Sequence, residues 1–178
     1  MKLKKGDKIE DLTLPSIDGT TFNLDSIKGK KAMISFYRYS SCPFCHLRMN
    51  EIINKTNEFG NNFVPIAIFD CDFDDLVKNS EKHDGNMTIL CDDDRVYFDK
   101  FEVQNSFFRF LLGITIRVDR FLRAIAKGYN PVSNMSGAFL GLPADILIDE
   151  NGLVEKALYG AHTANHIPMQ EVIEFSNS

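Results

Sequence analysis

The chain has 178 residues, 44% of them hydrophobic, which is enough for the core of one domain spanning residues 1–178. Its net charge of −5 argues against a nucleic-acid-binding surface, which would be basic. No apolar run follows the N-terminal lysines as in a secretory signal, and no run is suited to span a membrane, so the four cysteines indicate a reducing, cytoplasmic setting.

Strand patterns and helical patterns alternate along the chain. The expected elements are a hairpin (11–24), a buried strand (31–39), a helix (42–60), a buried strand (62–70), a polar helix (72–85), a strand (87–92), a short helix ending at Phe101, a hairpin (143–160) and a closing helix (166–175). Turn signals at Asp18-Gly19 and Asn151-Gly152 mark the two hairpins. The order predicts an α/β fold with a largely parallel sheet and an antiparallel final hairpin.

The most specific motif, SSCPFCHL, lies where the strand 31–39 passes into a helix. Ser40 and Ser41 are good N-cap residues, and Pro43 suits the first helical turn. Unpaired N–H groups and the positive end of the helix dipole would then stabilise a thiolate on Cys42. Cys45 follows one turn later, within reach of the Cys42 sulfur, so the pair is expected to close a disulfide.

Other chemistry also uses this spacing. C-x-x-C-H is the attachment signature of c-type haem, with Met49 as a poor candidate for an axial ligand. C-x-x-C is half of a zinc site, which His162 and His166 would have to complete, and two cysteines can also be inert core residues. Haem is attached outside the cytoplasm, zinc sites usually show two close pairs, and inert cysteines need no helix start. We therefore predict a redox dithiol without a metal or a bound cofactor.

Three segments together resemble one known family. They are KGDKIEDLTLPSIDGTTFNLDSIKGK (5–30), SSCPFC (40–45) and LGLPADILIDENGLV (140–154). They resemble the alkyl hydroperoxide reductase/thiol-specific antioxidant group of redoxins, and within it the peroxiredoxin-like proteins that carry C-P-x-C. The resemblance implies a thioredoxin-like fold, with a central mixed sheet flanked by helices, an N-terminal hairpin and a helical insertion at 104–136.

The resemblance also implies roles for individual residues. Cys42 matches the attacking cysteine of the family, and Cys45 matches its resolving partner. Pro143 matches a cis-proline that lies beside the dithiol, where the backbone of Leu142 would offer hydrogen bonds to a substrate. An ordinary trans proline at a strand start is the alternative for Pro143.

The sequence departs from typical peroxiredoxins just before the dithiol. Ser35 and Tyr39 stand where those proteins have a proline and a threonine, and the threonine hydroxyl helps to orient peroxide. Arg38 is placed to supply positive charge to the site, or else to face solvent at the end of the strand. The departures put peroxide reduction in doubt but leave dithiol chemistry intact.

An unusual segment, 107–128, combines an apolar helical stripe with a basic opposite face. Such a helix packs on its own domain, forms a homodimer contact or a lid, or lies on an anionic membrane surface. Because the segment falls within the expected insertion, it would lie near the active site.

Other chemistry-bearing residues give weaker signals. Asp70 and Asp72 form a D-x-D that resembles a phosphatase nucleophile motif or part of a calcium loop, although acidic residues at a strand end are commonly just solvated. Cys71 and Cys91 adjoin acidic residues, which raise a thiol pKa, and are expected to be unreactive. His46 either tunes the dithiol or faces solvent.

These observations predict an enzyme that reduces disulfides or hydroperoxides with a Cys42–Cys45 dithiol, reset by an external thiol donor of thioredoxin or glutathione type. The alternative is a non-enzymatic redox sensor whose dithiol switches a surface. Turnover with a reductant separates the two.

Overall fold

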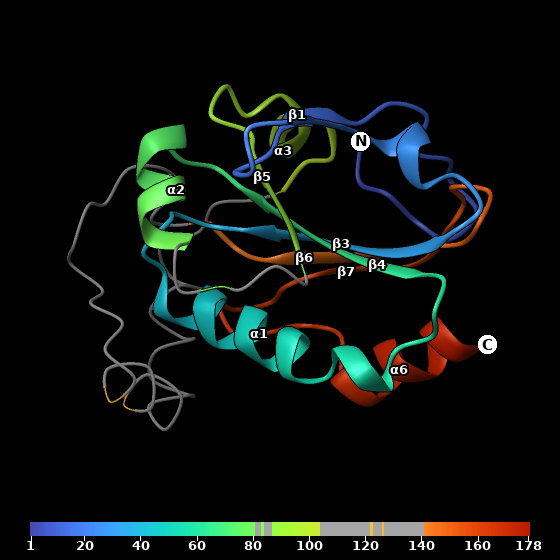
Figure 1. The fold of residues 1–178 in the computed structure, drawn as a ribbon. Helices are drawn as coiled ribbons and strands as arrows, with labels where there is room; N and C mark the ends of the chain where they lie inside the picture. The colour runs from blue at the N-terminus through green and yellow to red at the C-terminus, as the bar shows by residue number, and fades with distance from the viewer. Residues whose placement is uncertain (81–82, 84–86, 104–121, 123–125, 127–140) are drawn as a thin grey trace.

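A five-stranded mixed sheet forms the centre of the computed structural model, which describes residues 1–80, 83, 87–103, 122, 126 and 141–178 (Figure 1). The strands lie in the order β5-β4-β3-β6-β7. Their bounds are β3 (Lys31–Tyr37), β4 (Phe63–Phe69), β5 (Thr88–Cys91), β6 (Ala144–Ile148) and β7 (Val154–Tyr159). β3, β4 and β5 are parallel, whereas β6 and β7 run antiparallel to their neighbours. The predicted fold class is therefore confirmed, including the antiparallel final hairpin.

The two faces of the sheet are covered by different parts of the chain (Figure 1). Two helices cover one face, α1 (Pro43–Asn54) and α6 (Met169–Asn177). The other face is covered by β1 (Thr13–Pro15), β2 (Thr21–Asn23), the 3₁₀ turn η1 (Leu24–Ile27) and α3 (Val96–Lys100). Successive side chains of β3 point to opposite faces of the sheet and so contribute to both hydrophobic layers. Ile34 packs in the cluster with β1 and α3, while Met33 packs against α1 and α6.

Some element boundaries differ from those expected from the sequence. The strand expected over 31–39 ends at Tyr37, and α2 spans Phe73–Ser80. α1 ends at Asn54 and is followed by the 3₁₀ turn η2 (Thr56–Glu58), so Gly60 does not close the helix. Gly60 instead packs against the end of α6, where an added Cβ would overlap the carbonyl of Ser176. A close approach between backbones, rather than a helix cap, explains this glycine.

The expected insertion at 104–136 and its basic amphipathic segment at 107–128 lie outside the described residues, apart from Leu122 and Ala126. The dimer and membrane contacts suggested for this segment therefore stay predictions. Within the described ranges, no helix is both long enough and apolar enough to cross a membrane.

Candidate active site

Cys42 lies at the end of the turn between β3 and α1 and is the N-cap residue of α1. Its backbone is extended (φ −64°, ψ 115°), and its Sγ accepts the N–H of Cys45 at 3.4 Å. Pro43 follows at the first helical position, where a missing N–H costs no hydrogen bond. The expected N-cap role of Ser40 and Ser41 is therefore wrong, because the N-cap is the next residue, Cys42. Ser40 Oγ instead accepts a hydrogen bond from Asn79 of α2 at 3.0 Å.

Arg38 supplies a positive charge directly to the Cys42 sulfur. Its Nη2 lies 2.9 Å from Cys42 Sγ, and its side chain is buried rather than facing solvent. Burial of Cys42 alone would raise its pKa, but hydrogen bonds from Cys45 and the charge of Arg38 outweigh that effect and lower the pKa from 9.0 to about 6. Cys42 is therefore mainly a thiolate at neutral pH.

The pKa of Cys45 is shifted in the opposite direction from that of Cys42, although the two residues are one helical turn apart. Burial raises its thiol pKa well above the usual value, and the hydrogen bond and negative charge of Cys42 raise it further. Both cysteines are free thiols and buried in this structure. The pair thus holds one proton on Cys45 and a negative charge on Cys42, an asymmetry suited to attack by the first sulfur and resolution by the second.

Leu142 and Pro143 are buried immediately before β6. The last residue pair between β3 and β6 is Phe36 with Ala144, so Leu142 and Pro143 directly precede the paired part of β6 at the end of β3 from which the chain continues to Arg38. No peptide bond among the described residues is cis, so the expected cis-proline at Pro143 is wrong. The trans isomer is the intrinsically favoured form of an X–Pro bond, and β6 begins directly after it.

The sequence matches the AhpC/TSA family over residues 5–157, which include the dithiol, Arg38 and β6. The chain belongs to the AhpC/TSA family. It is accordingly an enzyme of the thiol peroxidase and thiol–disulfide oxidoreductase class, as the sequence predicted. No protein with a curated description matches it.

Solved structures of similar fold include a peroxidoxin, a thiol peroxidase and a domain of a thiol-disulfide oxidoreductase. Peroxidoxin BcpB from Mycobacterium tuberculosis superposes with a TM-score of 0.70 at 15% identity, covering 97% of this chain and 96% of that one. Thiol peroxidase from Chromobacterium violaceum gives 0.63 at 14% identity, covering 98% and 86%. The thioredoxin domain of a thiol-disulfide oxidoreductase from Bacteroides vulgatus gives 0.57 at 17% identity, covering 99% and 100%. At these identities the likeness establishes the thioredoxin-like fold.

The two positions where this AhpC/TSA protein departs from typical peroxiredoxins have other partners. Tyr39 is buried, its ring lies 5.3 Å from the Arg38 guanidinium carbon, and burial and the Cys42 thiolate both raise its pKa. Ser35 donates a hydrogen bond from Oγ to the carboxylate of Asp145 at 2.8 Å.

Asp145 is the centre of a buried polar cluster that the sequence did not indicate. Its carboxylate lies 3.1 Å from Nδ1 of His166, accepts the N–H of Ile167 at 2.9 Å and lies 4.0 Å from Arg48 of α1. Burial acts to raise its pKa, but His166, Arg48 and the Ile167 N–H lower it to about 2. The cluster connects α1 and the segment before α6 to the sheet through Asp145. His166, considered above as a candidate zinc ligand, instead contacts the carboxylate of Asp145.

We expect Asp145→Asn to lower the free energy of unfolding at pH 7 by roughly 2–4 kcal/mol, because an amide cannot replace the buried charge. The pKa of Asp145 falls from 3.8 to about 2 on folding, so its contribution is complete above pH 3.8 and is lost as the pH falls through about 2. That shift corresponds to about 2 kcal/mol. Urea unfolding of both proteins across this pH range measures the difference, with the exposed Asp94→Asn as control. A gap between wild type and variant that stays constant down to pH 2 would contradict the assignment.

His46 also has a partner that the sequence did not reveal. It is buried on α1, its Nδ1 lies 2.5 Å from Nε2 of His83, and the two rings stack with centroids 4.8 Å apart. Its Nε2 lies 2.7 Å from the carbonyl oxygen of Ser40. His46 therefore packs behind the active-site turn rather than facing solvent.

The remaining candidates are held in local structural contacts. Asp70 forms an ion pair with Arg95, and Asp72 accepts the N–H of Asp75 at the start of α2. His162 accepts the N–H of Ala164 in its own turn. Among the described residues, no group of three or more metal-binding side chains is arranged around a common point.

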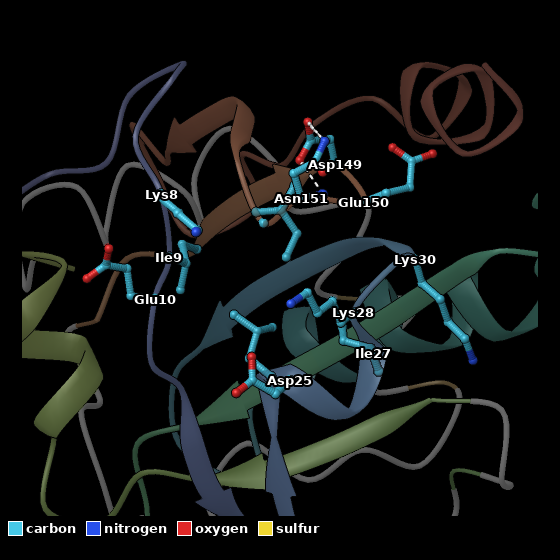
Figure 2. Close-up of a pocket in the computed structure, with 13 residues that line it drawn as sticks. Lys8, Ile9, Glu10, Asp25, Ile27, Lys28, Lys30, Asp149, Glu150 and Asn151 are labelled. Atoms are coloured by element: carbon cyan, nitrogen blue, oxygen red, sulfur yellow. Dashed lines mark hydrogen bonds between the residues drawn. The ribbon is translucent and has the colours of Figure 1, made fainter.

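Figure 2 shows a cavity of about 200 Å³. Its lining includes Ile27, Lys28 and Lys30, just before the start of β3, whereas the dithiol follows the end of that strand. Lys8, Lys28, Asp25 and Glu150 are among its lining residues, so its walls carry charges of both signs. It contains no cysteine and is separated from Cys42 by the length of the strand. The redox chemistry of this AhpC/TSA protein is therefore to be sought at the dithiol.

Proposed function

We propose that this protein reduces disulfides or hydroperoxides with Cys42 as the attacking nucleophile and Cys45 as the resolving thiol. The observation that carries the proposal is the environment of the Cys42 sulfur. This atom receives hydrogen bonds from Arg38 Nη2 and from the N–H of Cys45, and its pKa is lowered to about 6. A thiolate is the reactive form in both reactions.

The proposed reaction has two chemical steps on the protein. The Cys42 thiolate attacks one sulfur of a disulfide, giving a mixed disulfide and releasing a thiolate. Alternatively it attacks the terminal oxygen of a hydroperoxide, giving a sulfenic acid and an alkoxide or hydroxide, which takes up a proton from solvent and leaves as an alcohol or water. Cys45 then loses its proton and attacks the Cys42 sulfur. The products are a Cys42–Cys45 disulfide and a second thiol, or water in the peroxide reaction.

Resetting the enzyme requires two electrons from outside the chain. A dithiol donor of thioredoxin type, or glutathione, would supply them in a reducing cytoplasm. We propose that the donor or substrate approaches beside Leu142 and Pro143, because these residues directly precede Ala144, which pairs with Phe36 near the end of β3 and shortly before Arg38. Both sulfur atoms are buried in this structure, so this approach requires the site to open.

We expect the reduced protein to react faster with a small disulfide than with hydrogen peroxide. Peroxide cleavage needs donors aimed at the oxygen on which charge develops. Arg38 supplies one donor, but the buried ring of Tyr39 stands in place of the family threonine, and Ser35 is bonded to Asp145. Disulfide exchange needs only the thiolate, an approach path and Cys45.

Stopped-flow rate constants for both substrates at one pH measure this preference, and steady-state turnover with a thiol donor distinguishes an enzyme from a redox sensor. A peroxide rate several orders of magnitude above that of a free thiol would overturn the preference and identify a peroxidase. Oxidation of the dithiol without any turnover would favour the sensor.

A further inference from the structure

Cys71 and Cys91 lie together at the ends of two neighbouring parallel strands. The register of β4 and β5 pairs Phe69 with Cys91, and Cys71 follows Phe69 by two residues. The Sγ of Cys91 donates a hydrogen bond to the carbonyl oxygen of Cys71 at 3.0 Å. The side chain of Cys91, at the end of β5, therefore points toward Cys71, which follows the neighbouring strand β4.

The two thiols also interact with each other. A hydrogen bond between the two side chains, which favours the protonated form of Cys71, is the largest cause that raises the pKa of Cys71, followed by burial. Both thiols are free and buried, and they belong to the apolar cluster that also contains Cys42 and Cys45. The sequence gives no sign of this pair, because 19 residues separate the two cysteines.

We propose that Cys71 and Cys91 form a second dithiol, which closes to a disulfide between β4 and β5 when the protein meets a small-molecule disulfide. One of the two thiols loses its proton and attacks a sulfur of the oxidant, forming a mixed disulfide and releasing one small thiol. The other thiol then attacks the protein sulfur of the mixed disulfide. A Cys71–Cys91 bond forms, a second small thiol leaves, and the oxidant has gained two electrons and two protons.

The position of the pair allows this oxidation but makes it slow. β5 has four residues and lies at the edge of the described sheet, with Cys91 at its end, and Asp72 beside Cys71 is exposed. Edge segments open locally at a lower free energy than the centre of a sheet. The raised pKa of Cys71 keeps the thiolate population small, so we expect oxidation here to follow that of Cys42 and to accelerate with rising pH.

The new bond would close a loop that contacts the active-site turn. Residues 72–90 contain Asn79, which donates to Ser40 Oγ at 3.0 Å, and His83, which stacks on His46. Oxidation of the second dithiol would therefore restrain the residues that pack behind Cys42.

The test uses the full chain carrying Cys42→Ala and Cys45→Ala, so that its result does not depend on the proposed function. The folded variant is incubated with oxidised glutathione at pH 8, quenched with acid, unfolded, alkylated and mapped by mass spectrometry. We expect a peptide pair joined through residues 71 and 91, and a rise of several degrees in the unfolding midpoint that dithiothreitol reverses. The same treatment of wild type should give this cross-link in addition to the Cys42–Cys45 bond, and this second measurement stands if the variant does not fold.

Cys71→Ala and Cys91→Ala, each made in the same background, are the controls, and each should leave only a glutathione adduct on the remaining thiol. Treating the unfolded chain with the same oxidised glutathione is the positive control for the activity of the oxidant. Two cysteines that stay reduced in the folded protein, or that carry separate glutathione adducts without a cross-link, would overturn the proposal.

Discussion

Replacing Cys42 with serine is expected to lower turnover by about 10³-fold or more with either class of substrate, because a hydroxyl near neutral pH is a far weaker nucleophile than a thiolate. The lowered pKa and the hydrogen bond from Arg38 act on this sulfur, so no other cysteine is expected to substitute for it. Steady-state consumption of a thiol donor measures the loss. Asp94→Asn, at an exposed position without a thiol, is the control.

Replacing Cys45 with serine separates the two steps of the reaction. Cys42 keeps its charge partner Arg38 and should still attack, but the intermediate has no resolving thiol. We expect one equivalent of substrate to be consumed and a mixed disulfide or sulfenic acid to accumulate on Cys42, which mass spectrometry detects. Full turnover by either serine variant would show that the proposed assignment of roles is wrong.

Replacing Arg38 with methionine is expected to slow attack by Cys42 roughly tenfold or more at pH 7, and by a larger factor at pH 6. The guanidinium lies 2.9 Å from the sulfur, and its charge helps to lower the pKa of Cys42 to about 6. Without the charge, burial raises the pKa and the thiolate fraction falls. The higher intrinsic nucleophilicity of a more basic thiolate recovers part of the rate, which is why the loss is smaller than the change in thiolate fraction.

A pH–rate profile distinguishes this role from a structural one. The midpoint for the methionine variant should move to higher pH, and Arg38→Lys should restore part of the shift because it keeps a positive charge near Cys42. Urea unfolding checks that each variant is folded. A variant that loses rate at every pH without a shift in midpoint would show that Arg38 acts only through packing.

The parts of the fold that depend on local pattern were predictable from the sequence. The apolar run at 31–39 and the turn at Asn151-Gly152 placed a buried strand and a hairpin correctly, because strand length and turn chemistry are local properties. The position of Cys42 and Cys45 at the start of a helix was predicted in the same way, from a strand pattern that passes into a helical one. The end of α1 was missed because the reason for Gly60 is its contact with Ser176, far along the chain.

The surroundings of the dithiol could not be read from the sequence to the same depth. Arg38 faces either solvent or Cys42 depending on how the turn after β3 folds, and only the structure decides between them. Asp145 gave no signal, since its partner His166 lies on a different segment. The cis-proline expected at Pro143 came from the resemblance alone and is wrong. A contact between distant segments accounts for Asp145, whereas the conformation of the turn after β3 decides the position of Arg38.

We infer that Cys42 is a thiolate at neutral pH and is the most reactive cysteine of the chain. The most direct measurement is the pH dependence of iodoacetamide labelling of the reduced, folded protein, with each site followed by peptide mass spectrometry. We predict that Cys42 is labelled first and titrates with a midpoint near 6, the value to which its pKa is lowered. Earlier labelling of Cys45, Cys71 or Cys91, or a Cys42 midpoint near that of a free thiol at about 8.5, would contradict the account.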